Sequence, residues 1–126
     1  MGGMKLGLLG LALCASLAQA AGDAARGEAI AHNRSQSLCV LCHALPGLNP
    51  ALQGNLGPPL AGVGSRLDAN TLRQRLLAPQ RFNPDTVMPA YGPQDGLQQV
   101  AQAQRGRPLL SAEQIDDLVA WLASLR

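Results

Sequence analysis

Residues 37–45 read "SLCVLCHAL", which places two cysteines two residues apart with a histidine directly after the second. Cys39, Cys42 and His43 together have the C-x-x-C-H form of a c-type haem attachment site. Two thiols at this spacing can reach the two vinyl groups on one edge of a porphyrin. The next residue then brings its imidazole under the iron. The same residue types could also form a redox-active thiol pair, a disulfide or part of a zinc site.

The surrounding sequence argues against these alternatives. A thioredoxin-like thiol pair is typical of a βαβ context, whereas the flanking segments have the pattern of helix and loop. A tetrahedral zinc site needs four ligands, and His32 is the one further histidine of the chain. A disulfide would leave the long loops with nothing to organise them. The motif therefore predicts one covalent haem c on Cys39 and Cys42, with His43 as the proximal iron ligand.

The start of the chain has the pattern of a secretory signal peptide. A short segment ending in Lys5 precedes the almost entirely apolar residues 6–17, and Ala18-Gln19-Ala20 has the small-x-small form of a cleavage site. The apolar run is too short to cross a bilayer. We therefore expect a cleaved signal peptide over residues 1–20 and a single domain over residues 21–126.

Two other interpretations of this segment are weaker. A lipid-modified Cys14 would need a small residue before it, and Leu13 is bulky. An uncleaved anchor would be followed by a basic cluster, and none follows. Export predicts a periplasmic location, where a lone cysteine pair would normally become oxidised.

The composition of the expected domain excludes some functions. The chain has ten Lys and Arg residues against eight acidic ones. Lys5, the one lysine, leaves with the signal peptide, so the net charge of the domain is close to zero. This balance argues against general binding to nucleic acid or anionic lipid. One Trp, one Tyr and one Phe are few large groups for a core, so a planar cofactor would help to fill the interior.

Capping residues and hydrophobic spacing predict an all-α fold of short helices separated by long loops. The last helix is the clearest, because Ser111 and Gln114 form a capping box and apolar residues then recur at helical spacing. Asp116 and Asp117 fall early in this helix, where we expect them to be solvated. No segment alternates like a strand. The other expected segments are a helix over 24–31 capped by Asp23, a helix from Asp68 to Pro79, loops over 46–65 and 82–92, and one or two helical turns within 97–104.

Met88 is the candidate for the second axial ligand of the iron. It is the one methionine of the expected domain, and it lies far downstream between Pro84 and Pro89, which would stiffen its loop. A thioether is a soft ligand, and a His/Met pair raises the reduction potential of a haem. The alternatives are that Met88 is a core residue, or that His32 is the ligand. An iron with both axial positions filled suits electron transfer and not substrate turnover.

Other residues are candidates for supporting roles. A ligand imidazole needs an acceptor for its second nitrogen. A proline carbonyl within residues 56–60 could be that acceptor, and an ordinary turn is an equal alternative there. Arg81, Asn83 and Tyr91 flank Met88, and we hypothesise that one of them contacts a haem propionate or the Met88 sulfur. We recognise no catalytic set of residues.

Taken together, these residues resemble class I cytochromes c. Gly27, the C-x-x-C-H motif, Gly57-Pro58 and Met88-Pro89 occur in the order of that family. The resemblance implies an all-α, class I cytochrome c-like fold whose short helices and long loops wrap around one covalent haem. It also implies that the first and last helices cross, with Gly27 and Trp121 at the contact. Pro58 would then provide the carbonyl that orients the proximal histidine.

A closer resemblance is to the SoxX family, the small haem subunits of the SoxAX cytochromes of sulfur oxidation. It runs over nearly all of residues 21–126 and is most specific in "NPDTVMPAY", 83–91, and "LSAEQIDDLVAWL", 110–122. The resemblance implies a heterodimer with a SoxA-type haem subunit, which carries the catalytic haem. In that family the pair, an L-cysteine S-thiosulfotransferase, joins thiosulfate to a cysteine of the carrier SoxYZ. The released electrons pass through SoxX, itself not catalytic, to a soluble cytochrome.

Two other functions stay open at this point. The chain could be a free-standing periplasmic electron shuttle, or a ligand-sensing or peroxidatic haem protein in which Met88 leaves the iron. The low net charge favours the subunit over the shuttle, because free shuttles often use a charged face for encounter. Residues 92–108 form a longer connection than a minimal cytochrome needs, and they could meet a partner.

Overall fold

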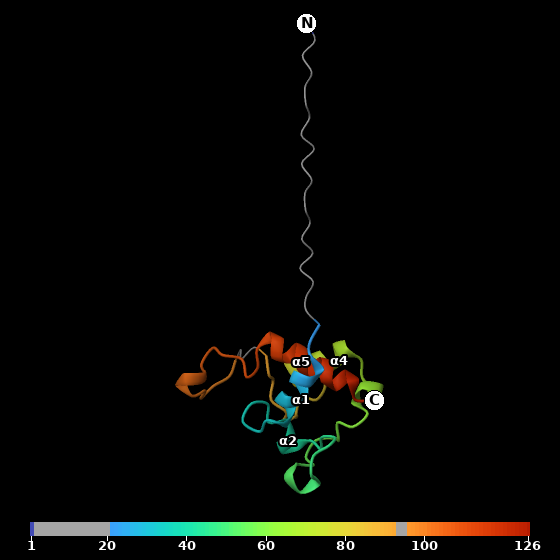
Figure 1. Ribbon diagram of the computed structural model, residues 1–126. Coiled ribbons are helices and arrows are strands. Elements are labelled where there is room, and N and C mark those ends of the chain that lie inside the picture. Colours follow the sequence, from blue (N-terminus) through green and yellow to red (C-terminus); the bar gives the residue numbers. More distant parts are fainter. Residues whose placement is uncertain (2–20, 93–95) are drawn as a thin grey trace.

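The computed structural model describes Met1 and residues 21–92 and 96–126 (Figure 1). Apart from Met1, the expected signal peptide and Cys14 lie outside the described residues. Within the described ranges, no helix is both long enough and apolar enough to cross a membrane.

Helices connected by long loops make up the described chain, and none of its described residues is in a strand. The predicted all-α architecture of short helices and long loops is therefore confirmed. The α-helices are α1 (Ala24–His32), α2 (Cys39–Cys42), α3 (Val63–Arg66), α4 (Ala69–Leu77) and α5 (Ala112–Ser124), and the 3-10 turns are η1 (Pro50–Leu52), η2 (Pro79–Arg81) and η3 (Gln102–Gln104).

The predicted helix starts are confirmed by their capping hydrogen bonds. The Asp23 side chain accepts from the Arg26 N–H at the start of α1. The Asp68 side chain accepts from the Thr71 N–H at the start of α4. Ser111 and Gln114 form both hydrogen bonds of the capping box at α5. These bonds satisfy backbone donors that have no partner within a helix.

The loop predictions are only partly right. Residues 46–65 contain the turn η1 and the beginning of α3. Asn49 caps η1 through its side chain, and Pro50 starts it. Between residues 97 and 104 only η3 forms, because Gly96 and Gln99 both have positive φ angles that interrupt a helix.

Helix α5 is the centre of the fold, because α1, α3 and α4 all pack against it (Figure 1). Ile115, Leu118 and Trp121 are among the buried side chains of α5. They belong to one cluster with buried residues of the other helices, including Ile30 of α1 and Leu72 of α4. The predicted apolar stripe of the last helix therefore lies in the core of the domain.

Helices α1 and α5 cross at Gly27, as the family resemblance implied. A Cβ atom on Gly27 would lie 2.8 Å from the Trp121 Cβ, and closer still to the backbone carbonyl of Asp117. Only glycine lets the two helix backbones approach this closely. The crossing places the Trp121 side chain, 4 % exposed, inside the domain.

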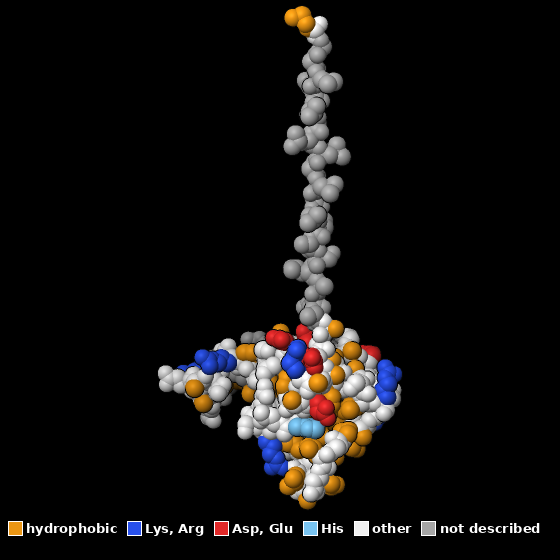
Figure 2. All heavy atoms as spheres, viewed as in Figure 1, with side chains coloured by type: hydrophobic (Ala, Val, Ile, Leu, Met, Phe, Trp, Pro, Cys, Tyr) orange, Lys and Arg blue, Asp and Glu red, His pale blue; other side chains and the backbone are white. Residues whose placement is uncertain are grey.

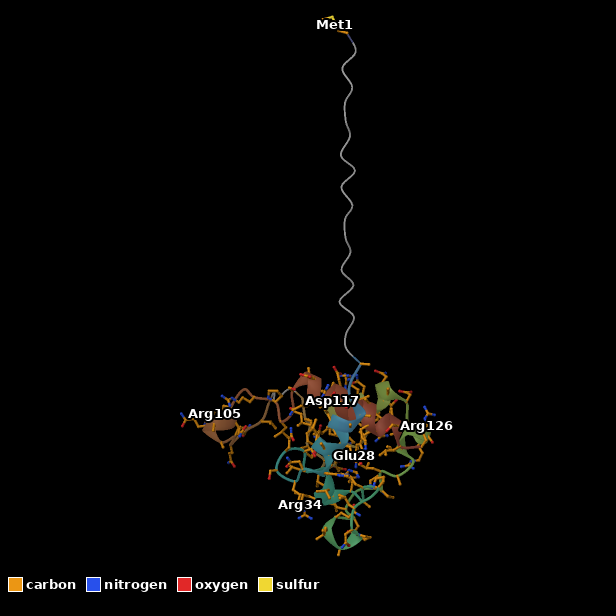
Figure 3. All side chains as sticks on the ribbon, in the orientation of Figure 1. Met1, Glu28, Arg34, Arg105, Asp117 and Arg126 are labelled. Carbon is orange, nitrogen blue, oxygen red and sulfur yellow. The ribbon has the colours of Figure 1, made fainter. Side chains whose placement is uncertain are left out.

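Asp117 lies in this crossing, so the expectation that it is solvated is wrong. The residue is 2 % exposed. The carboxylate accepts hydrogen bonds from the Asp23 N–H at 2.7 Å and from Arg26 Nε and Nη2 at 2.7 and 2.8 Å. Figure 2 shows acidic and basic side chains gathered over this crossing, and Figure 3 labels Asp117 there.

Asp116 also departs from the expectation, since Arg73 of α4 donates to its carboxylate. Successive residues on a helix point about 100° apart. The two adjacent carboxylates therefore connect α5 to two different helices, α4 and α1.

Residues 96–109 form an arm that projects from the helical body (Figure 1). All of these residues except Val100 are exposed, and Figure 3 shows Arg105 at the tip. Among the described residues, the hydrogen bonds of the arm join residues of the arm to one another, for example Arg105 Nε to the Val100 carbonyl. At its base the Leu110 N–H donates to the Tyr91 carbonyl at 3.1 Å, so the arm is closed at its neck.

The glycine at the crossing gives a first prediction. In Gly27→Ala the added methyl group meets backbone and not a flexible side chain, so α1 and α5 must separate. We expect the free energy of unfolding of the haem-loaded protein to fall by about 1–3 kcal/mol, although alanine favours helices. Guanidinium denaturation followed by circular dichroism measures the change. Glu28→Ala, at the exposed neighbour, is the control and should change the free energy of unfolding by less than about 0.5 kcal/mol.

The buried carboxylate gives a prediction about pH. Hydrogen bonds from Arg26 hold the pKa of Asp117 below its ordinary value of 3.8. A carboxyl with a lowered folded pKa stabilises the fold above its unfolded pKa, and this stabilisation is lost as the pH falls through the folded value. We expect Asp117→Asn to cost about 1–3 kcal/mol at neutral pH. Its free energy of unfolding should also change less than that of wild type as the pH falls below 3.8. Equal acid dependence of the two proteins would contradict this role.

Candidate functional site

A cavity of about 490 Å³ opens beside the C-x-x-C-H motif. Its volume lies in the range of about 300–1,000 Å³ that is typical of cofactor sites. Buried side chains of α4 and α5 form part of its wall, among them Leu72, Leu76, Leu118 and Trp121. Most of the other lining residues come from α2 and the residues on either side of it, from residues 56–67, which include α3, and from residues 79–91. The cavity is therefore cut into the hydrophobic core itself.

The motif forms one wall of this cavity. Cys39 and Cys42 are the first and last residues of the one-turn helix α2, and both line the cavity as free thiols. Burial raises the pKa of the Cys39 thiol. Leu38, which precedes α2, has a left-handed backbone with φ 63°, a conformation that costs a non-glycine residue on the order of 1–3 kcal/mol. The described residues contain no cluster of three or more metal-binding His, Cys, Asp and Glu side chains.

His43 follows directly, and its ring is held in one orientation. Its N–H donates to the Cys39 carbonyl at 2.9 Å and ends α2. Its ring Nδ1 lies 2.6 Å from the Pro58 carbonyl oxygen. A carbonyl oxygen only accepts, so this contact assigns the proton to Nδ1 and leaves the lone pair on Nε2. The Pro58 carbonyl thus lies where the family resemblance implied.

The loop that carries Pro58 is fixed against the motif. Gly57 donates its N–H to the Cys42 carbonyl at 2.7 Å, and Leu60 donates to the Ala44 carbonyl at 2.9 Å. A Cβ on Gly57 would lie 2.7 Å from His43 Nδ1. A side chain at position 57 would therefore push the imidazole out of place.

Met88 lines the same cavity as His43 and packs against the hydrophobic core. The Thr86 hydroxyl accepts from its backbone N–H at 3.1 Å. His32, the alternative ligand, does not line the cavity. Its ring instead packs edge-on against Trp121, with ring centroids 6.0 Å apart.

The three polar residues that flank Met88 lie in different places. Tyr91 lines the cavity, and its hydroxyl donates to the Ser37 carbonyl, which precedes the motif. Asn83 also lines the cavity, and its side chain accepts from the Asp85 N–H at 3.1 Å. Arg81 does not line it, and donates to Gln74 at 3.4 Å.

Among the residues of the cavity wall that sequence reasoning missed are an arginine and an aromatic residue that contact each other. Arg75 of α4 lines the cavity, and its guanidinium carbon lies 4.3 Å from the centroid of the Phe82 ring. Phe82 also lines the cavity. The two are seven residues apart across the end of α4, and no local pattern indicates this pairing.

These residues fit a covalently bound haem. The cavity is mostly apolar, as the faces of a porphyrin require. Two free thiols lie at one wall, and a histidine beside them has its Nε2 lone pair available. A thioether belongs to the same cavity. The site thus has the donor set of a His/Met haem.

Comparison with known proteins agrees with this fit. Residues 24–126 match the family model described as cytochrome c. Among solved structures, the chain is similar to a chain of the "Crystal structure of SoxXA from P. pantotrophus", with 32% sequence identity and a TM-score of 0.75. The match covers 88% of this chain and 87% of that chain. None of the curated proteins matches significantly.

The similarity to a SoxXA chain confirms the resemblance to SoxX that the sequence segments carry. A match to the family model over nearly all of residues 21–126 establishes the broader family. The chain therefore belongs to the cytochrome c family, as an electron-transfer protein with covalently attached haem c.

Proposed function

We propose that this cytochrome is the electron-transfer subunit of a periplasmic thiosulfate-oxidising complex of the SoxAX type, an L-cysteine S-thiosulfotransferase. The observation that carries the proposal is the similarity to a SoxXA chain along 88% of this sequence. In this role the chain takes electrons from a SoxA-type catalytic subunit, which acts on the carrier SoxYZ. It passes them to a soluble cytochrome and does no sulfur chemistry itself.

The proposed haem ligands account for this division of labour. Cys39 and Cys42 would anchor the haem by thioether bonds, and His43 and Met88 would be its axial ligands. The haem supplies reversible one-electron storage. With His43 and Met88 both bound to the iron, no position would be left for a substrate. The residues of this chain then only keep the ligands in place and exclude water.

A second contact of His43 would strengthen the binding of its imidazole to the iron. The Pro58 carbonyl fixes the imidazole tautomer that offers Nε2 to a metal, and a hydrogen bond to Nδ1 raises the basicity of the ring. Gly57 leaves the space in which this contact forms.

The exposed arm favours a subunit over a free shuttle. Leu97, at 59 % exposed, is apolar and has no cover within the described residues. Residues 96–109 also contain Arg105 and Arg107 and no acidic residue. An exposed segment with apolar and cationic side chains is typical of an interaction site.

The ligand assignment predicts a spectroscopic change. Met88→Ala should remove the weak red absorption band that thioether–iron ligation gives in oxidised haem proteins. It should also lower the reduction potential on the order of 0.1 V, within the range of about 0.8 V that axial ligands control. Leu52→Ala, at an exposed residue that does not line the cavity, and His32→Gln are the controls and should change neither property. A Met88→Ala protein that keeps the band would exclude Met88 as the ligand.

The subunit assignment predicts a stable partner. The tagged, haem-loaded chain, expressed in its native host, should copurify with a larger haem protein and become reduced when thiosulfate and the carrier are added. Introducing Leu97→Asp together with Arg105→Glu should weaken copurification at least tenfold and leave the haem spectrum unchanged. Leu52→Asp, also at an exposed leucine, is the control and should have no effect.

The outcomes of this experiment are distinct. A chain that copurifies with no haem protein and is not reduced would be a free shuttle. If the complex still forms when both residues of the arm are changed, the chain is still a subunit. The arm is then not its contact with the partner.

A further inference from the structure

Ser37 is the buried residue that leads into the C-x-x-C-H motif, and it is 0 % exposed. Its N–H donates to the Asn33 carbonyl at 3.1 Å, and its hydroxyl donates to the Ala31 carbonyl at 3.4 Å. Its carbonyl oxygen differs from these groups, because its two donors among the described residues both belong to side chains. They are the hydroxyl of Tyr91 and the thiol of Cys39. A buried carbonyl of this kind depends on the side chains that donate to it.

Attachment of a haem at Cys39 would remove one of these two donors. In that step the S–H bond adds across a vinyl group: the sulfur bonds to one vinyl carbon and the hydrogen goes to the other. Nothing leaves, and no oxidant or reductant is consumed. The thioether sulfur has no hydrogen to donate, so the contact of 3.8 Å between Cys39 Sγ and the Ser37 carbonyl oxygen is lost as a hydrogen bond. The Tyr91 hydroxyl is then the one donor left to this carbonyl among the described residues.

Tyr91 is fixed where its hydroxyl meets the Ser37 carbonyl. Its N–H donates to the carbonyl of Leu76 in α4 at 2.9 Å, and its own carbonyl accepts from the Leu110 N–H at 3.1 Å. The backbone of Tyr91 is thus held from both sides, and the residue is 3 % exposed. A tyrosine side chain has only two torsions to fix, so the anchored backbone presents the hydroxyl in a nearly constant place.

The Ser37 carbonyl controls the conformation of the residue that follows it. This carbonyl and the Leu38 nitrogen belong to one planar peptide group, so a donor that holds the carbonyl also restrains the φ angle of Leu38. That angle is 63°, in the left-handed region, where a residue other than glycine stays only when its surroundings hold it. Leu38 directly precedes Cys39, and both line the cavity. The direction in which the Cys39 side chain leaves the backbone therefore depends on this turn.

We propose that Tyr91 is a positioning residue for the attached haem: its hydroxyl holds the Ser37 carbonyl, and with it the left-handed turn at Leu38 from which Cys39 enters the cavity. Tyr91 acts through the backbone before the motif and needs no contact with the iron. Without its hydroxyl the haem-loaded protein would contain a buried acceptor with no donor, which costs more than the loss of an exposed hydrogen bond. The inference rests on the haem attachment given under the proposed function, but it requires no partner subunit.

The residue at position 39 separates this role from simple packing of the Tyr91 ring. In Cys39→Ser a hydroxyl takes the place of the sulfur and can donate to the Ser37 carbonyl. In Cys39→Ala position 39 offers no such donor. Cys42 remains as the haem anchor in both variants. If Tyr91 acts through the carbonyl, the hydroxyl at position 39 compensates for the loss of the Tyr91 hydroxyl. If only the ring matters, the two variants respond alike.

The test introduces Tyr91→Phe, which removes only the hydroxyl, into haem-loaded wild type, Cys39→Ser and Cys39→Ala. Guanidinium denaturation followed by haem absorption measures the equilibrium constant of unfolding. We expect Tyr91→Phe to raise this constant roughly tenfold in wild type and in Cys39→Ala, because a buried carbonyl loses its donor. The rise should be about threefold or less in Cys39→Ser, where the new hydroxyl replaces that donor. Equal rises in Cys39→Ser and Cys39→Ala would overturn the proposal.

A vibrational measurement with the native cysteines decides the question if a variant at position 39 retains no haem. Tyr91→Phe should shift the carbon–sulfur stretching band of the thioethers in the resonance Raman spectrum, because the turn before Cys39 relaxes. Ser124→Ala is the matched control, since the Ser124 hydroxyl also donates to a backbone carbonyl, that of Trp121 at 2.6 Å. Its loss should leave the band unchanged. A band that is unshifted in Tyr91→Phe would equally overturn the proposal.

Alkylation separates this proposal from the proposed function. In the denatured wild-type protein Cys39 should not react with iodoacetamide, because its sulfur is bonded to the haem. A reactive Cys39 would contradict haem attachment itself, and the proposal with it. An unreactive Cys39 together with equal rises in the two variants at position 39 would contradict only the role of Tyr91. None of these readouts needs a partner, so a failure of the subunit assignment would leave them intact.

Discussion

The cavity beside the C-x-x-C-H motif is the constraint on which the rest of the structure depends. Leu72, Leu76, Leu118 and Trp121 belong both to the core cluster and to the cavity wall. The chain has only three aromatic residues among Phe, Tyr and Trp, too few to fill this space with its own side chains. Haem binding and folding are therefore linked: a ligand that binds only the folded chain stabilises it by mass action.

Ion pairs between helices add to the packing of the small hydrophobic core. Asp116 and Asp117 each connect α5 to a different helix, through Arg73 and Arg26. Because Asp117 is buried and its partner is partly exposed, the pair contributes mainly by satisfying the carboxylate inside the crossing. Helix α5, which lies at the centre of the core, thus also carries the two carboxylates that pair with arginines of α1 and α4.

Much of this fold and site could be predicted, because the decisive signals are local in the sequence. Three helix caps and the C-x-x-C-H motif depend on residues within one turn of each other. The burial of Asp117 could not be predicted, since it depends on a crossing of helices separated by 91 residues along the chain at Arg26–Asp117. The place of Arg75 was missed for a similar reason. Arg75 lines the cavity only because several elements of the fold together form that wall.

The closed neck of the arm separates two kinds of change that this protein could undergo in evolution. Tyr91 and Leu110 hold the ends of the arm together by one backbone hydrogen bond, and Tyr91 also lines the cavity. The entropy of closing a loop rises slowly with its length, by about 0.6 kcal/mol for each doubling. The arm can therefore lengthen, shorten or change its side chains at little cost to the haem site. The exposed surface of the arm can diversify while the residues that line the cavity stay the same.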